Sequence, residues 1–238
     1  MLPQFYQKIA ALNASQHSAI HLQPVERFDF AKSGNAIHLQ VSEFAKAMSA
    51  YPIVFVGEGE QLWAAALTGL SKARNLFIDD QGQWSEDYVP AYVRRYPFVI
   101  ANIDKGQAAV CIDEAYSGFN RDGQGDALFT EDGKHSEHLK QTITFLEDFE
   151  QAAVKTQFFC QQLVEFDLLE PMAAKVEPAN AEREEVVLQG FQVISRQKLA
   201  NLPAERLKQL NDNGVLELVY YHLASLNQFD ALLARYNA

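Results

Sequence analysis

Short apolar runs separated by turn residues make up the first half of the chain. Many of them alternate apolar and polar residues, or are rich in β-branched and aromatic residues, as strands are. Turns such as Lys32–Asn35 and Gly57–Glu60 separate neighbouring runs. The expected strands are His17–Leu22, Ala36–Val41, Ile53–Val56, Leu62–Leu70, Asn75–Asp79, Phe98–Ile103 and Ala108–Ile112. The alanines of Leu62–Leu70 also allow a helix there.

The second half of the chain has the spacing of helices. From Ser136 onward, apolar residues recur at intervals of three and four, which predicts a long helix. We expect it to extend to Leu169, because Pro171 stops a helix. The polar stretch Glu177–Glu185 is typical of a surface linker, and Val186–Ile194 has the composition of one late strand.

Shorter helices are expected on both sides of this long one. Ser42 is a candidate N-cap for a helix that ends before Pro52. Asn213-Gly214 is a typical end for a helix near the C-terminus, and Val215–Leu233 is amphipathic. The long polar loop Ser117–Asp126 lies between the strands and the helices.

Together these patterns predict an α+β fold. An antiparallel sheet or partial barrel is expected over residues 1–115, with a mainly helical part, residues 116–238, packed on it. We expect the two subregions to form one cooperative domain.

Composition supports a globular protein and narrows its setting. The 238 residues are 48% hydrophobic and 21% charged, which is enough for a sizeable core. The longest apolar runs are too short to span a bilayer, and the first residues lack a secretory pattern, so a cytoplasmic location is expected. The net charge of −11 argues against nucleic-acid binding, although it leaves room for a local anion site. The oligomeric state stays open.

Cysteine and histidine positions indicate neither a metal nor a cofactor. Cys111 and Cys160 fit no zinc or redox spacing and are expected to be free and buried. His135 and His138 are spaced to share a helix face, but no further ligand accompanies them. His17 is expected at the surface.

The stretch from Trp84 to Phe98 is the strongest candidate for a site. It holds one of the two tryptophans, three of the nine tyrosines and the adjacent Arg94 and Arg95. A guanidinium group can bind a carboxylate or phosphate through two parallel hydrogen bonds. Tyr92 and Tyr96 could stack on such a ligand, and Trp84 and Tyr88 could complete the wall.

The ordinary alternative is that these arginines are structural. On a strand, adjacent side chains point to opposite faces, so a joint clamp would require a loop. One arginine would then pair with an internal carboxylate such as Asp87 or Asp113, and the other would be solvated. We expect a division of roles, with Arg95 buried near Asp113 and Arg94 available to a ligand.

Two adjacent acids are the candidates for proton transfer. Asp113 and Glu114 follow a predicted strand, where a carboxylate could act as general acid or base. Adjacent acids are also common at strand ends without any such role. The loop Asn120–Asp126 lacks the alternating acids and closing glutamate of a calcium loop, and is interpreted as a flexible loop or lid.

The sequence resembles the bacterial SapC family. The likeness extends through most of the chain and is most specific in the central block. It is carried by Tyr51–Phe55, Asn75–Asp79 with Gly82 and Trp84, Tyr88–Phe98, Cys111–Glu114, Leu128-Phe129, Gly133 and Gly214 through Leu226.

The resemblance implies a setting rather than a mechanism. The family takes its name from surface-layer proteins, and its members are often encoded near TonB-dependent receptors and flavin-dependent halogenase-like proteins. This implies an accessory role in nutrient uptake or modification. The resemblance brings no catalytic residues, so none is carried over.

Three hypotheses remain. The first is a non-enzymatic binding or accessory protein that recognises an anionic small molecule or a protein partner. The second is an enzyme at the same place, with Asp113 or Glu114 as acid or base. The third is a structural surface-layer subunit, which would need an export route. A deep pocket with an arginine and a carboxylate would favour the enzyme, and a flat aromatic patch would favour a partner protein.

Overall fold

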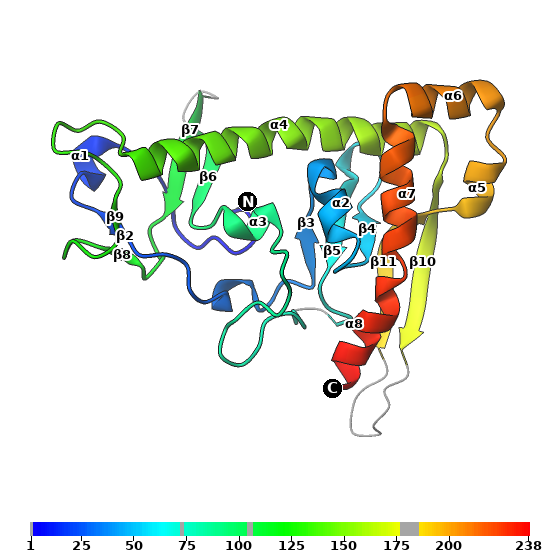
Figure 1. The fold of residues 1–238 in the computed structure, drawn as a ribbon, viewed down its shortest axis with the longest axis horizontal. Helices are drawn as coiled ribbons and strands as arrows, with labels where there is room; N and C mark the ends of the chain where they lie inside the picture. Colours follow the sequence, from blue (N-terminus) through cyan, green and yellow to red (C-terminus); the bar gives the residue numbers. More distant parts are fainter. Residues whose placement is uncertain (1, 72–73, 104–106, 177–185) are drawn as a thin grey trace.

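The computed structural model describes residues 2–71, 74–103, 107–176 and 186–238. These residues form an elongated α+β structure with antiparallel sheets and no closed barrel, so the predicted fold class is confirmed (Figure 1). The strands are β1 (Ile9–Ala11), β2 (His21–Leu22), β3 (Ala36–His38), β4 (Ile53–Val56), β5 (Trp63–Leu67), β6 (Phe98–Ile103), β7 (Gln107–Asp113), β8 (Phe119–Asn120), β9 (Asp126–Ala127), β10 (Leu169–Val176) and β11 (Val186–Ile194). The α-helices are α1 (Ala14–His17), α2 (Phe44–Ala47), α3 (Ala91–Arg94), α4 (Glu137–Glu165), α5 (Arg196–Ala200), α6 (Ala204–Asp212), α7 (Val215–Ser225) and α8 (Gln228–Asn237).

A five-stranded sheet in the order β10-β11-β4-β5-β3 forms one end of the molecule. β4 and β5 form an antiparallel hairpin, with Ile53 opposite Ala66 and Val56 opposite Trp63, so the segment Leu62–Leu70 contains a strand and not a helix. Its turn needs a glycine at position 57, where φ is +88° and a Cβ would lie 2.4 Å from the Gln61 carbonyl oxygen. Because β10 and β11 join strands from the first half of the chain, residues on both sides of position 115 share this sheet. One cooperative domain stays a prediction.

Two smaller sheets form the other end. β1, β7 and β6 pair side by side, with Phe98 opposite Ile112 and Ile9 opposite Asp113. The short strands β8 and β9 flank β2.

The 29-residue helix α4 connects the two ends and runs along both of them (Figure 1). It begins as predicted, with the Ser136 hydroxyl accepting a hydrogen bond from the Leu139 amide. At 1.5 Å per residue it is about 43 Å long. Leu139 and Leu146 pack beside β6 and β7, whereas Phe159 and Leu163 pack against the five-stranded sheet.

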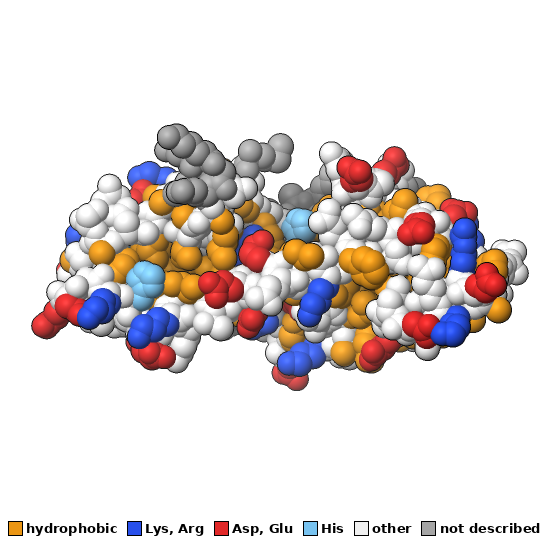
Figure 2. Space-filling view, turned by 90° about the horizontal axis from the view of Figure 1, so that it is seen from above, with side chains coloured by type: hydrophobic (Ala, Val, Ile, Leu, Met, Phe, Trp, Pro, Cys, Tyr) orange, Lys and Arg blue, Asp and Glu red, His pale blue; other side chains and the backbone are white. Residues whose placement is uncertain are grey.

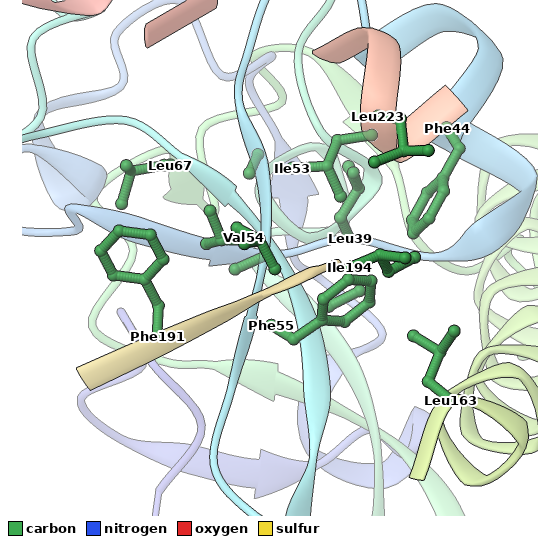
Figure 3. Close-up of a cluster of buried hydrophobic side chains, with 14 of the residues drawn as sticks. Leu39, Phe44, Ile53, Val54, Phe55, Leu67, Leu163, Phe191, Ile194 and Leu223 are labelled. Carbon is green, nitrogen blue, oxygen red and sulfur yellow. The ribbon is translucent and has the colours of Figure 1, made fainter. Parts of the chain in front are cut away.

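The largest hydrophobic core lies on the five-stranded sheet. Figure 3 shows Phe55 and Ile53 of β4 converging with Leu163 of α4 and Leu223 of α7. Phe44 of α2 and Phe159 of α4 meet edge to face, with ring centroids 5.7 Å apart. Burial of this kind contributes about 1.5–3 kcal/mol for each large side chain.

The ends of two helices differ from the prediction. The helix predicted to start at Ser42 is preceded by a 3₁₀ turn, Val41–Glu43, that is capped by Gln40 and Glu43. The long helix ends at Glu165 and not at Leu169, because Asp167 takes a left-handed φ of +51°. The chain then enters β10, a strand that the periodicity did not indicate.

Two predicted strands are also wrong over much of their length. In the segment predicted as the strand His17–Leu22, His17 is the last residue of the helical turn α1. Only His21 and Leu22 are extended, as β2. The segment Asn75–Asp79 turns instead, because the Asn75 side chain accepts a hydrogen bond from the Phe77 amide.

Other expectations have clearer outcomes. His17 is buried and not at the surface. Its Nδ1 accepts a hydrogen bond from the Asn13 amide, 3.1 Å away. The loop expected to be flexible is held by the Asn120 side chain, which accepts from the amides of Asp122 and Gln124. Cys111 and Cys160 are free and buried, as predicted.

The predicted linker Glu177–Glu185 lies outside the described residues. Within the described part of the chain, no helix combines the length and apolar character that crossing a membrane requires.

Candidate functional site

Arg94 and Arg95 lie on a helical turn rather than on a strand. The short helix α3 begins after Pro90 and ends at Arg94, and Arg95 is its C-cap residue. A cis peptide bond follows between Tyr96 and Pro97, and β6 starts at Phe98. The turn exposes Arg94 to solvent and leaves Arg95 only 7% exposed. The burial of Arg95 therefore agrees with the expectation from the sequence.

Aromatic rings surround the Arg95 guanidinium. Its carbon lies 4.1 Å from the Tyr92 ring centroid, 4.7 Å from that of Phe149 and 5.9 Å from that of Tyr6. Burial raises the pKa values of Tyr6 and Tyr92, although the charge of Arg95 opposes the rise. Both phenols therefore stay neutral near pH 7, and neither supplies a counter-charge.

The pairing of Arg95 with acidic groups is weak. Its Nη1 lies 3.9 Å from Oε1 of Glu150, a half-exposed side chain on α4. Its Nε has no hydrogen-bond partner although it is buried. The neutral Tyr6 and Tyr92 hydroxyls are its nearer polar neighbours. A buried charge without a close counter-charge is costly, and such groups concentrate at functional sites.

Arg94 takes a different position beside the same helix. Its Nε donates to the Val89 carbonyl oxygen at 2.9 Å, and its guanidinium carbon lies 5.1 Å from the Phe145 ring centroid. Cation–π contact with Phe145 holds the exposed side chain along α4, and the Tyr88 ring lies on another side of it, 6.0 Å from the guanidinium carbon.

Both arginines line a cleft of about 370 Å³. One wall is the first half of α4, and the others are the chain around β2 and the α3–β6 junction. The cleft is lined by Leu22, Pro24, Val25, Arg94, Arg95, Tyr96, Pro97, Phe98, His138, Gln141, Thr142 and Phe145. None of these residues is acidic. Acidic and basic side chains are interspersed on the face seen along α4, so this cationic lining is a local feature (Figure 2).

Tyr96 lines this cleft and also a second, more polar groove of about 840 Å³. Its ring stacks on Phe30 at 4.0 Å, and its hydroxyl lies 3.4 Å from Oδ2 of Asp113. Tyr96 and Pro24, which lines both hollows as well, thus lie between the cleft and the groove.

Asp113 and Glu114 lie apart from the cleft. Asp113 is fully buried and accepts hydrogen bonds from the amides of Gln7 and Lys8, at 2.9 and 2.8 Å. Arg95 therefore does not take Asp113 as its partner, which corrects the expected pairing. Glu114 faces outward to Lys8 at 2.8 Å, and this ammonium group lowers the pKa of the carboxyl.

Trp84 and Tyr88 also have structural partners. The Trp84 Nε1 donates to the Tyr51 hydroxyl at 2.8 Å. The Tyr88 hydroxyl donates to the buried Glu43 at 2.7 Å, and the same carboxylate oxygen accepts from the Ala91 amide. Glu43 thereby fixes the start of α3, and neither aromatic ring lines the cleft.

A family model described as SapC matches residues 12–232. The chain belongs to the SapC family. No curated protein and no solved structure matches this SapC chain. The matched range contains every residue that lines the cleft.

Several residues of the site in this SapC chain gave no signal in the sequence analysis. Tyr6, Phe149 and Glu150 approach Arg95 from distant parts of the chain. The residues of α4 could have been noticed, because His138, Gln141, Thr142 and Phe145 have the i, i+3, i+4, i+7 spacing of one helix face. His138 lies 3.3 Å from Asp126, and the described residues hold no group of three or more metal-ligating side chains.

Proposed function

We propose that this SapC-family chain is a non-enzymatic binding or accessory protein that recognises an anionic small molecule. The binding place is the cleft between α3, the start of β6 and the first half of α4. One observation carries the proposal. Arg95 is buried beside the cleft, its Nε has no hydrogen-bond partner, and its ion pair with Glu150 is long, at 3.9 Å. No acidic residue lines the cleft.

The physical argument is that an anion would complete this arrangement. A buried guanidinium needs an acceptor, and a bidentate carboxylate or phosphate is the group it binds best. Arg94 would approach the same anion from the exposed side of the cleft. In a chain with net charge −11, the local cationic lining gives an anion one favourable place to bind.

The shape of the cleft and the positions of Asp113 and Glu114 help to choose between a small-molecule site, a protein interface and an enzyme. The site is a cleft and not a flat aromatic patch, which favours a small molecule over a protein partner. The carboxylates considered for acid–base catalysis, Asp113 and Glu114, do not line it, which favours binding over catalysis. We further propose a cytoplasmic location, which the two free cysteines support, and an accessory role in TonB-dependent nutrient uptake.

Thermal melting in the presence of small anions tests the proposal. Benzoate, citrate and inorganic phosphate would each be compared with chloride at equal ionic strength. We expect at least one to raise the Tm by about 3–6 °C when present at about ten times its Kd. The double variant Arg94→Met/Arg95→Met should lose this shift.

Arg121→Met is the matched control, because Arg121 is an exposed arginine outside the cleft. It should keep the full shift. A parent protein that no anion stabilises, or a double variant that responds as the parent does, would refute anion binding at this cleft.

A further inference from the structure

We infer that the anion is a monocarboxylate with an apolar body about 10 Å long, such as a medium-chain fatty acid, lying along α4 with its carboxylate at Arg95. The inference rests on the proposed function, since it names the class of anion that the same cleft would take.

The walls of the cleft call for an apolar body. Leu22 and Phe98 belong to the hydrophobic cluster under α4, and Phe145 adds an aromatic face from the helix itself. At about 370 Å³ the cleft is near the lower end of the range of about 300–1,000 Å³ for small-molecule sites. A ligand made mostly of polar groups would leave these walls without a favourable contact.

The geometry of α4 gives the length and direction of the ligand. His138, Gln141, Thr142 and Phe145 lie on one face of the helix, and the first and last are about 10 Å apart along its axis. Arg94 lies over Phe145, so the cationic end is at the Phe145 end of this face. His138 lines the opposite end, where its Nδ1 lies 3.3 Å from the Asp126 carboxylate. A single anionic group is therefore expected at one end only.

The charge of the site fits one negative charge, and its chemistry fits a carboxylate. The Glu150 carboxylate, 3.9 Å from Arg95, already offsets part of the guanidinium charge. A phosphate dianion would bring a second charge against apolar walls, where it could not be hydrated. Glu150 is itself a carboxylate beside this guanidinium, and a ligand carboxylate that came closer than 3.9 Å would form a stronger hydrogen-bonded ion pair.

A chain-length series tests the inference by isothermal titration calorimetry on the full chain. The probes are butanoate, hexanoate, octanoate and dodecanoate, each below its micelle concentration, with inorganic phosphate for comparison. Affinity should rise about three- to four-fold for each added methylene until the cleft is filled. For a length of about 10 Å this corresponds to roughly eight carbon atoms, and dodecanoate should gain nothing further.

A matched pair of threonine variants locates the apolar body. Thr142 lines the cleft, whereas Thr144 is exposed on another face of α4, and both hydroxyls bond the carbonyl four residues earlier. Thr142→Phe should fill the middle of the cleft, between the Phe145 end and the His138 end, weakening octanoate binding at least about ten-fold and leaving the shorter butanoate unchanged. Thr144→Phe should bind both acids as the parent does.

The outcomes separate this inference from the proposed function. Suppose that butanoate and octanoate bind equally, or that phosphate binds more tightly than octanoate, and that binding still requires Arg94 and Arg95. The monocarboxylate is then wrong while the anion site stands. If neither the acids nor phosphate bind in an arginine-dependent way, both are wrong. The series on the parent decides this even if Thr142→Phe folds poorly.

Discussion

The two ends of the molecule are stabilised in different ways. We call the five-stranded sheet with α2, α7, α8 and residues 151–165 of α4 the core region. The cleft region is β1, β2, α3, β6–β9 and residues 137–150 of α4. The core region buries one large apolar cluster, whereas the cleft region divides its apolar side chains among smaller clusters with charged groups between them.

The difference is clearest in how each region treats a buried polar group. In the core region, the fully buried Ser225 hydroxyl accepts a hydrogen bond from the Ile53 amide at 2.9 Å and donates one to the His222 carbonyl oxygen at 2.6 Å. In the cleft region, Asp113 anchors the N-terminal segment, but Arg95 lies beside a cleft with its Nε unsatisfied. The large apolar core and the candidate site therefore lie at opposite ends of one helix, α4.

The largest effect should follow from a cavity in the core region. Phe55 is fully buried in the main cluster, and Phe55→Ala should lower the free energy of unfolding by about 3–5 kcal/mol. Phe145→Ala removes the same side chain from a half-buried wall of the cleft and should cost clearly less. Urea unfolding of both variants makes the measurement. Equal losses would contradict the division between the two regions.

A carboxylate should be the corresponding anchor of the cleft region. Asp113→Asn turns one accepting oxygen into a donor against the amides of Gln7 and Lys8, so we expect a loss of about 2–4 kcal/mol. The adjacent Glu114→Gln breaks only an exposed ion pair and should cost less than about 1 kcal/mol. Limited proteolysis near residue 8 would detect release of the N-terminal segment. An Asp113→Asn protein as stable and resistant as Glu114→Gln would contradict this anchoring role.

Acid should weaken the core region through His222. Burial lowers the pKa of His222 to about 3 in the folded chain, against about 6.5 when it is unfolded. The neutral imidazole therefore contributes its full stability above pH 6.5, and this contribution falls as the pH drops toward 3. Between pH 6.5 and 4.5 the loss from this one group should be about 2–3 kcal/mol.

The control for this effect is His222→Gln, which cannot titrate. It should be less stable at pH 7 and should lose less on acidification than the parent. His38 has a pKa lowered to about 4, chiefly by burial, and contributes a smaller loss in both proteins. Parallel curves of unfolding free energy against pH would show that His222 plays no part.

The smallest effect concerns the competition for Arg95. Glu150→Gln removes the internal carboxylate and should tighten octanoate binding about two- to five-fold, because one weakly screened charge contributes about 1 kcal/mol or less. Glu147→Gln, a change of the same charge on an exposed position of α4, should leave affinity nearly unchanged. Weaker octanoate binding in Glu150→Gln than in Glu147→Gln would mean that Glu150 positions Arg95 instead of competing for it.

Much of the fold could be predicted because its signals are local. The β-branched and aromatic composition of Ile53–Val56 and Val186–Ile194 identified β4 and β11, and Ser136 marked the start of α4. The errors occurred where one residue overrides the surrounding pattern. Asp167 ends α4 in a left-handed conformation, and the Asn75 side chain replaces a strand by a turn.

The candidate site could be predicted only in part. The density of aromatic and charged residues around Arg94 and Arg95 indicated a site, and both arginines line the cleft with Tyr96. The helical turn that holds the arginine pair was not predicted, since a single turn after Pro90 has too few residues to display a period. The opposite wall, on α4, comes from residues more than 40 positions away, and no local pattern connects the two.

Arg95→Met tests the central claim most directly, because it asks of one residue whether it serves stability or binding. Methionine keeps an unbranched apolar side chain that reaches about as far as the Arg95 Nε, but it removes the guanidinium group and its charge. We expect the free energy of unfolding to stay within about 1 kcal/mol of the parent, or to rise, since an uncompensated buried charge is removed. Octanoate binding, measured by calorimetry on the same sample, should be lost. A variant destabilised by about 3–5 kcal/mol that still binds octanoate as the parent does would contradict the account, because Arg95 would then be a structural residue.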